Sequence, residues 1–434
     1  MSALDATLLP SLLLYLDPGT GSMLFSAVVG FAAASFFALK GLIVRAPTQL
    51  RAWFGRHAGD SAQDRRLVVY SEGGQYEGTF RPLLQELARR GIGCLYLSSD
   101  AGDPLLQSGI AGVVTRHIGR GPAAWAQLNT LHAEVCIMTT PGLDVLQIKR
   151  SRHVRHYAHL IHSPTDKAFN RPYSFDYFDS VILCGPHQER TLRCLEQLRG
   201  QPPKLLVQAG CLYYDEMLPA YRELPPVQHS AKAPLHVLIA PTWGKNGLLT
   251  RYGMRVIRPL VEAGLRVTVR PHPQSWISEA ALLADLREQT REFAELRWDD
   301  SRDALHAMSE SHLMVSDISG VLFDYCFLTE KPVLSLAFEP ERRGFEANDL
   351  PYDPWELTVL DIVGKKVGEG DLPRLASLAA DMAGDVSRTA QIRALREQYV
   401  LHFGQAAVPA VDALEDILQL AAAGGARALA ASPA

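Results

Sequence analysis

Three short polar segments in the second half of the chain carry residue types that can bind a phosphate. They are Ala240-Pro241-Thr242-Trp243, Arg270-Pro271-His272-Pro273 and Ser316-Asp317-Ile318-Ser319-Gly320, and each directly follows a short apolar run. An apolar run that ends in a polar turn is typical of a buried strand followed by a loop. Because the carboxyl ends of parallel strands open on the same edge of a sheet, a guanidinium, an imidazole and several hydroxyls would meet there. We predict a diphosphate-binding site at this edge.

The third segment carries a second feature that favours anion binding. Apolar residues at helical spacing, Val321, Leu322, Tyr325 and Leu328, follow the turn that ends at Gly320. The turn would therefore form the N-terminus of a helix, where free backbone N–H groups and the positive end of the helix dipole attract phosphate. An ordinary helix cap made by Ser or Asp is the alternative interpretation of the same residues.

The first half of the chain offers one histidine that is placed to act as a general base. His162 ends an apolar run and is followed by Ser163-Pro164-Thr165-Asp166-Lys167, which predicts a strand end and a loop. A pKa near neutrality suits imidazole for this role, with a structural role as the alternative. His153, His156 and His159 precede it at a spacing of three, which alternates between the faces of a strand and does not predict a metal site. We predict no cofactor and leave open a divalent ion such as Mg²⁺.

Composition limits the classes of protein to which the chain can belong. The 434 residues are 47% hydrophobic and 21% charged, which allows two or three packed units. The net charge of -4 lacks the basic surface of a nucleic-acid-binding protein, so we expect no nucleic acid partner. The six cysteines form no C-x-x-C pair, which favours a reducing compartment.

Two similar α/β units are indicated by the order of apolar and polar stretches. From Leu67 onward, short apolar runs alternate with polar helical stretches, the pattern of a parallel, doubly wound sheet. A Pro- and Ser-containing stretch at Leu224 to Pro234 interrupts this pattern, which restarts at Val237. We therefore predict an α/β fold with two Rossmann-like domains facing a cleft, at residues 61–224 and 225–420, the second including C-terminal helices. Residues 421–434 are expected to be a flexible tail.

Residues 1–60 are predicted to be a membrane anchor. The uncharged run Met23 to Leu39 predicts one transmembrane helix at about residues 21–44. Lys40 and Arg45 follow this run and nothing basic precedes it, so the positive-inside rule predicts a single-pass protein of the inner (cytoplasmic) membrane with its domains in the cytoplasm. A cleaved signal peptide and a buried core helix are the alternatives. The missing basic start disfavours the first, and the near absence of polar residues disfavours the second.

The polar segments together carry a family resemblance. The three segments of the second half, with Val321-Leu322-Phe323-Asp324 and Lys331-Pro332-Val333 after them, resemble the CDP-glycerol glycerophosphotransferases of teichoic acid biosynthesis. Upstream, Ile161-His162-Ser163-Pro164 is similar to the Trp-His-Gly-(Thr)-Pro element of that family, and Gly210 to Asp215 loosely resembles its Gly-x-Pro-Arg-x-Asp turn. The resemblance covers roughly Tyr157 to Leu350. The sequence departs from it at Gly320, where the family usually has a second Ser, and at both neighbours of His162.

The resemblance implies a fold, an activity and a set of site residues. It implies the glycosyltransferase B (GT-B) fold, with residues 61–224 as the acceptor domain and residues 225–420 as the nucleotide-donor domain. The implied enzyme transfers glycerol phosphate, or a related polyol phosphate, from a CDP-activated donor to a hydroxyl of a lipid-linked or cell-envelope glycan acceptor and releases CMP. His162 would be the base on that hydroxyl, and His272 would stabilise the phosphate or the departing CMP. Donor binding is implied for Thr242, Arg270, Ser316, Asp317, Ser319, Gly320 and Asp324.

Two other functions remain open from the sequence. The first is a glycosyltransferase of the same fold that uses a nucleotide sugar in capsule or lipopolysaccharide synthesis. The second is a non-catalytic, membrane-associated scaffold that binds a nucleotide. The choice of donor separates the first alternative from polyol phosphate transfer, and the effect of replacing His162 and His272 separates the second.

Overall fold

The structure is a computed structural model that describes residues 35, 66–225, 233–301, 304–336 and 340–423. Apart from residue 35, the predicted anchor and its transmembrane helix at residues 21–44 lie outside the described residues. Most of the predicted tail lies outside them as well, although α16 reaches Ala422. Among the helices of the described ranges, none has the length and apolar character needed to cross a bilayer.

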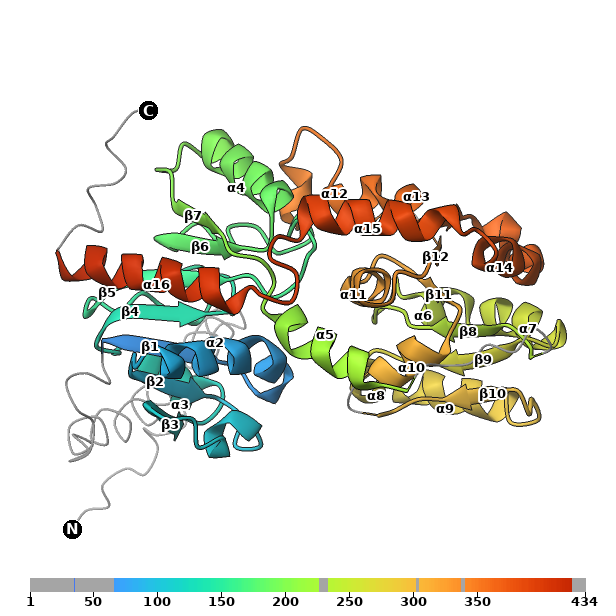
Figure 1. Cartoon of the computed structure of the whole chain (residues 1–434), viewed down its shortest axis with the longest axis horizontal. Helices are drawn as coiled ribbons and strands as arrows, with labels where there is room; N and C mark the ends of the chain where they lie inside the picture. The colour runs from blue at the N-terminus through green and yellow to red at the C-terminus, as the bar shows by residue number, and fades with distance from the viewer. Residues whose placement is uncertain (1–34, 36–65, 226–232, 302–303, 337–339, 424–434) are drawn as a thin grey trace, which may run out of the picture.

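The N-terminal domain is built on a parallel sheet that is covered by helices on both faces (Figure 1). Its strands are short, apolar and mostly buried, as expected where helices cover both faces. Helix α2 packs on one face, while α3 and α4 pack on the other. In the described part of the chain the strand order is β3-β2-β1-β4-β5-β6-β7. The bounds are β1 Leu67–Ser71, α2 Glu77–Arg89, β2 Cys94–Ser98, β3 Val113–His117, α3 Pro122–Leu128, β4 Ala133–Met138, β5 Val154–Leu160, β6 Ser180–Leu183, α4 Pro186–Arg199, β7 Leu205–Gln208 and α5 Tyr213–Glu223.

The C-terminal domain repeats this architecture. Its described sheet is also parallel, in the order β10-β9-β8-β11-β12-β13. Helices α7, α9 and α14 cover one face, and α10 to α13 cover the other. The bounds are β8 His236–Ile239, α6 Leu248–Tyr252, α7 Met254–Glu262, β9 Arg266–Val269, α8 Ser275–Ser278, α9 Ala280–Gln289, β10 Leu296–Trp298, α10 Leu305–Glu310, β11 Leu313–Ser316, α11 Gly320–Thr329, β12 Val333–Leu336, α12 Trp355–Thr358, α13 Leu360–Val363, β13 Gly364–Val367 and α14 Leu375–Ala383.

The prediction of two parallel α/β units is confirmed, with one strand that the pattern did not indicate. Strand β13 reads Gly-Lys-Lys-Val and pairs with β12 at the edge of the sheet. Its two lysines are exposed, so the strand lacks the apolar run by which a buried strand is predicted. The strand begins with Gly364. This position requires glycine, because a Cβ would lie 1.7 Å from the Val333 carbonyl oxygen. A side chain there would separate the two strands.

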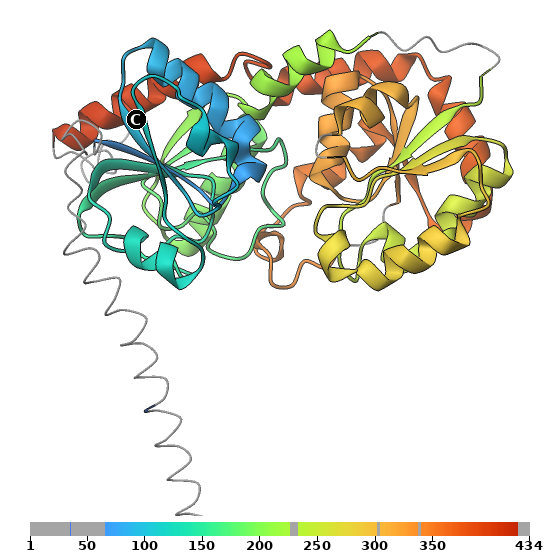
Figure 2. The ribbon, with the colours of Figure 1, turned by 90° about the horizontal axis from the view of Figure 1, so that it is seen from below.

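The C-terminal helix returns to the N-terminal domain. Helix α15 (Ser387–Tyr399) lies on the C-terminal domain, and α16 (Ala407–Ala422) lies on the N-terminal sheet beside α2 (Figures 1 and 2). The segment between the two helices passes so close to Gly185 that a Cβ there would lie 1.9 Å from the Tyr399 carbonyl oxygen. This placement differs from the prediction, which put residues 225–420 in one domain. Amphipathic spacing indicates that a helix has a buried face, but not which sheet that face covers.

The loops at the carboxyl ends of both sheets meet between the domains. Asp166, in the loop after β5, accepts a hydrogen bond from the backbone N–H of Trp355 in α12 at 2.6 Å. Tyr214 of α5 donates its hydroxyl hydrogen to Asp324 of α11 at 3.0 Å. One continuous group of buried apolar side chains includes residues of both domains. The two edges at which ligands bind in such sheets therefore face the same interdomain space.

We predict that Asp215 anchors the returning helix. Its two carboxylate oxygens accept the backbone N–H groups of Ala406 and Ala407 at 2.9 and 2.7 Å, which caps the start of α16. Asp215→Ala should lower the free energy of unfolding by about 1–2 kcal/mol, the usual loss for an N-terminal cap. Asp416→Ala, at an exposed position of the same helix, is the control and should change it by less than about 0.5 kcal/mol. Urea unfolding followed by circular dichroism measures both. Equal effects of the two substitutions would contradict the capping role.

Candidate functional site

The N-terminus of α11 is an open end at the carboxyl edge of the C-terminal sheet. Ser319 occupies the cap position, but its side chain makes no capping hydrogen bond. The first N–H groups of a helix have no partner within it, so they are available to an anion. No other atom lies within 4 Å of the position that a Cβ of Gly320 would occupy. The Ser319 N–H donates to the Asp317 carbonyl oxygen at 3.0 Å, so the start of α11 offers the N–H groups of Gly320 and Val321, with free space beside Gly320.

Ser316 and Asp317 lie just before α11 in the chain and support the start of this helix. Both are fully buried. The Ser316 hydroxyl donates to the Ala240 carbonyl oxygen at 2.6 Å, and Asp317 accepts the backbone N–H groups of Thr242 and Leu248 at 2.7 and 2.9 Å. Burial raises the pKa of Asp317 to about 6. These contacts fix the β8–α6 loop against the start of α11, so Ser316 and Asp317 shape the site that the sequence predicted them to line. Thr242 takes part in this arrangement through its backbone N–H, which donates to Asp317.

His272 contributes a directed N–H donor from the loop after β9, which is separated from β11 by β8. Its Nδ1 accepts the backbone N–H of Gln274 at 3.1 Å, so the neutral ring carries its hydrogen on Nε2. Burial lowers the pKa of His272, which keeps the ring neutral at neutral pH. The indole ring of Trp243, which is 47% exposed, lies 6.3 Å from the imidazole ring. A neutral imidazole that donates from Nε2 can bind a phosphate oxygen.

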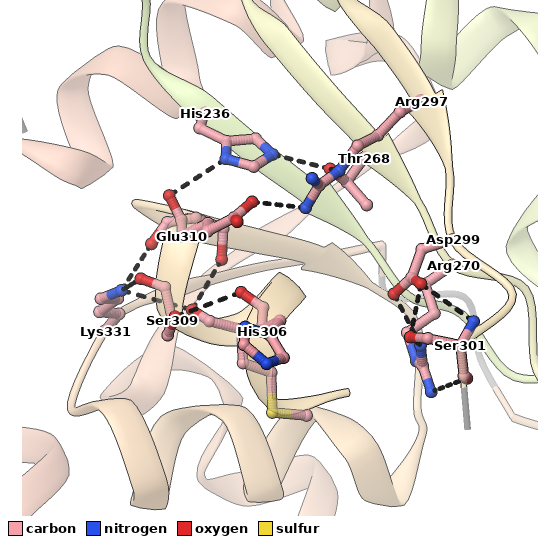
Figure 3. A network of polar contacts seen from close by, with 12 residues as sticks. His236, Thr268, Arg270, Arg297, Asp299, Ser301, His306, Ser309, Glu310 and Lys331 are labelled. Atoms are coloured by element: carbon pink, nitrogen blue, oxygen red, sulfur yellow. Dashed lines mark hydrogen bonds and ion pairs between the residues drawn. The ribbon is translucent and has the colours of Figure 1, made fainter. Parts of the chain in front are cut away.

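Arg270 and Lys331, which belong to the family-like segments, are engaged within the domain (Figure 3). The Arg270 guanidinium donates to Asp299 at 2.6 Å and to the Ser301 hydroxyl at 3.0 Å. Its side chain is 13% exposed, so it is held differently from the phosphate clamp that the resemblance implies. Lys331 donates to backbone carbonyl oxygens at the end of α10, including that of Ser309 at 2.7 Å. A lysine in this position stabilises a helix C-terminus.

His162 lies in the loop at the carboxyl end of β5, in the opposite domain. Its Nδ1 is buried and has no hydrogen-bond partner among the described residues. The ring packs edge-on against Tyr76 with 5.0 Å between centroids. Burial, assisted by the charges of Lys167 and His159, lowers the pKa of His162 well below its ordinary value. The imidazole is therefore neutral at pH 7, which is the form that accepts a proton.

The other histidines of the repeat have structural surroundings. His156 hydrogen-bonds to Ser180 at 2.8 Å, and the ring of His159 packs between two phenylalanines. His153 stacks on His132 with 4.0 Å between ring centroids. In the ranges that the structure describes, no group of three or more His, Cys, Asp or Glu side chains could hold a metal ion.

The loop that carries His162 is held in place by two residues at the start of α4. The ring of His187 hydrogen-bonds to the Pro164 carbonyl oxygen at 2.5 Å. The Gln188 amide donates to the carbonyl oxygens of Ser163 and Thr165 at 3.0 and 2.8 Å. These backbone contacts fix the position of the base candidate before any substrate arrives, as expected of a preorganised site.

Asp324 and two residues that the sequence analysis did not assign lie between the domains. Asp324 accepts the hydrogen bond from Tyr214, and burial raises its pKa to about 7. Lys167 and Glu356 are both buried, at 8% and 5% exposure. Asp324 therefore connects the domains instead of reaching the donor turn. No local pattern distinguishes Lys167 and Glu356, because buried and solvated polar residues of loops look the same in the sequence.

Comparisons with known proteins identify the fold. No protein-family model and no curated protein sequence matches the chain. Among solved structures, S. aureus MnaA, in a co-structure with UDP, has a TM-score of 0.56 at 12% identity, over 82% of this chain and 97% of that one. The UDP-GlcNAc 2-epimerase of Methanocaldococcus jannaschii, in complex with UDP-GlcNAc and UDP, has a TM-score of 0.54 at 11% identity, over 81% and 99%. That of Neisseria meningitidis, bound to UDP-GlcNAc, has a TM-score of 0.52 at 12% identity, over 81% and 99%. At this identity the likeness shows the fold alone, and it confirms the two-domain GT-B architecture.

We predict that Asp324 makes stability depend on pH. Its pKa is about 7 in the folded protein against an ordinary 3.8, so between these values the folded state binds more protons than the unfolded state. The free energy of unfolding therefore falls as pH rises through this window. Asp324→Asn keeps an oxygen for Tyr214 and cannot ionise. It should be more stable than the wild type by roughly 1–3 kcal/mol at pH 8 and by much less at pH 4.

Urea unfolding at the two pH values measures this difference. Asp416→Asn, an exposed aspartate, is the control and should show no such difference between pH 4 and pH 8. An Asp324→Asn effect of the same size at both pH values would contradict the assignment of the raised pKa to Asp324.

Proposed function

We propose that the chain is a transferase that uses a nucleotide-activated donor, and that it moves glycerol phosphate or a related polyol phosphate from a CDP-activated donor to an acceptor hydroxyl. The observation that carries this proposal is the open, uncapped N-terminus of α11 at Gly320, on the same carboxyl edge of the sheet as the loop that holds the Nε2 donor of His272. This arrangement suits a diphosphate. His162, a neutral imidazole on the facing edge of the other domain, suits an acceptor hydroxyl.

The reaction follows from the chemistry of these groups. His162 accepts the proton of the acceptor hydroxyl, whose oxygen attacks the β-phosphorus of the donor. The bond between that phosphorus and the oxygen bridging to CMP breaks, and CMP leaves with the electron pair. Nε2–H of His272 and the N–H groups at the start of α11 stabilise the negative charge on the phosphate oxygens. Phosphoryl transfer depends mainly on such positioning and charge stabilisation.

The predicted membrane anchor suggests where the acceptor lies. A transmembrane helix at residues 21–44 would hold both domains at the cytoplasmic face of the inner membrane. A lipid-linked or cell-envelope glycan acceptor is built at such a surface. The proposed localisation and acceptor class rest on the sequence pattern of residues 1–60.

A nucleotide-sugar transferase of the same fold is the second candidate. The similar structures from S. aureus and M. jannaschii contain UDP, and the latter also contains UDP-GlcNAc. Such an enzyme would use the same end of α11 for the diphosphate. It would differ in the nucleobase of the donor that it selects and in the bond of the donor that it breaks. A non-catalytic scaffold would bind a nucleotide without needing His162.

We predict that the full-length protein in detergent binds cytidine nucleotides through His272. Titration calorimetry with CDP-glycerol and CMP should show binding that His272→Ala weakens about 10-fold, the loss of one hydrogen bond to a charged group. His272→Gln is the matched variant, because its amide can replace the Nε2 donor, and it should lose less. Preference for UDP would favour the nucleotide-sugar alternative. Absence of binding by the folded protein to all three ligands would contradict a nucleotide-donor site.

We predict that a side chain at Gly320 blocks the donor without disturbing the fold. The position has free space around its Cβ and an ordinary φ, so Gly320→Leu should place its side chain where the phosphate would lie. Nucleotide affinity should fall by at least about 10-fold, because the phosphate loses its N–H donors. Gly370→Leu is the control, since it also has free space and lies in the exposed segment before α14. Similar affinities in the two variants would place the donor elsewhere.

A further inference from the structure

Lys167 is a buried lysine held in an uncommon backbone conformation. Its φ is +66°, in the left-handed region that residues other than glycine rarely adopt. The residue is 8% exposed, and its ammonium donates to the hydroxyl of Ser163, directly after His162. A left-handed backbone and a buried cation both oppose folding unless the surroundings compensate for them. A solvated loop lysine would show neither feature.

Buried carboxyl groups from both domains act on the charge of Lys167 through space. Asp166 precedes it and is hydrogen-bonded to Glu356 of α12, and Asp324 of α11 also acts on the ammonium. Asp166 in turn accepts the Trp355 N–H at 2.6 Å. Burial raises the pKa of both Asp166 and Glu356, and the charge of Lys167 acts in the opposite direction on each. Lys167 is thus the cation of a buried group that exists only when the two domains are in contact.

Among the charged groups around His162, Lys167 has the largest effect on the imidazole. The ring contacts Tyr76 from the turn before α2, and His159 lies below it on β5. Glu72 of the turn after β1 acts on the hydroxyl of Tyr76. Asp324 and Glu356 face Lys167 from the other domain. Lys167 is therefore placed to influence the base without contacting a substrate.

We propose that Lys167 is a positioning residue for His162: its ammonium, which donates to the Ser163 hydroxyl, fixes the loop of the base next to the contact between Asp166 and α12 and keeps a positive charge near the imidazole. This inference rests on the proposed function in that His162 acts as the base. It links the base to the domain contact, because Asp166, directly before Lys167, accepts the backbone N–H of Trp355 in α12. Loss of this charge would let the imidazole bind a proton more readily and thereby lose its ability to accept one from the acceptor.

The test replaces Lys167 by Met, which keeps its length, and by Arg, which keeps its charge. Histidine resonances of the ¹³C-histidine-labelled full-length protein in detergent report the pKa of His162, which the His162→Gln spectrum assigns. Lys167→Met should raise this pKa and shift the acidic limb of the kcat/KM profile to higher pH. Affinity for CMP should stay within about twofold, because the donor site lies in the other domain. Lys204→Met, a second buried lysine that pairs with Glu196, is the control and should leave the pKa of His162 unchanged.

An unchanged pKa of His162 and an unchanged pH profile in folded Lys167→Met would overturn the proposal. If that variant unfolds, Lys167→Arg decides: a profile like that of the wild type supports the proposal, and a profile shifted to higher pH with normal thermal unfolding overturns it. The resonance measurement needs no turnover. Absence of transfer from any CDP-activated donor would therefore refute the proposed function while leaving the relation between Lys167 and His162 tested on its own.

Discussion

The contact between the loop after β5 and helix α12 is the constraint on which the site depends. Asp166 receives the backbone N–H of Trp355 at 2.6 Å, and the indole ring of that tryptophan lies 4.3 Å from the ring of His187 and 5.1 Å from that of Phe323. A buried carboxyl group that lost this partner would be strongly unfavourable, so the two segments are held in register. Because His162 is in that loop and α11 packs beside α12, this contact also sets how the base candidate faces the donor site.

The candidate site works mainly through neutral groups and backbone dipoles. Burial lowers the pKa of both His162 and His272, so both imidazole rings are neutral at neutral pH. The hydrogen-bonding groups of Ser316 and Asp317 are directed into the β8–α6 loop, and the guanidinium of Arg270 is paired with Asp299. Positive potential for a phosphate therefore comes from the N-terminus of α11, an arrangement that needs no unpaired buried cation in the donor domain.

Local sequence patterns predicted the apolar strands, but not β13, together with the two α/β units and the helix that begins at Gly320, because apolar runs and their spacing report directly on burial. They placed His162 and His272 correctly at strand ends. They could not reveal that Arg270 pairs with Asp299 or that Asp324 binds Tyr214, since the partners are 29 and 110 residues away in the chain. The return of α16 to the first domain and the burial of Lys167 are equally long-range facts. Both depend on how the domains pack and not on any spacing within a segment.

The identity of the nucleotide product distinguishes transfer of a polyol phosphate from transfer of a sugar. Phosphorus NMR of the full-length protein, incubated with CDP-glycerol and a membrane fraction as the source of acceptor, identifies the nucleotide product. Transfer of a polyol phosphate breaks the bond between the β-phosphorus and the bridging oxygen, so CMP should accumulate and a new phosphodiester signal should appear in the glycan fraction. Accumulation of a nucleoside diphosphate, from CDP-glycerol or from a nucleotide sugar supplied in its place, would show that the chain breaks the bond on the other side of the diphosphate. That result would contradict the account.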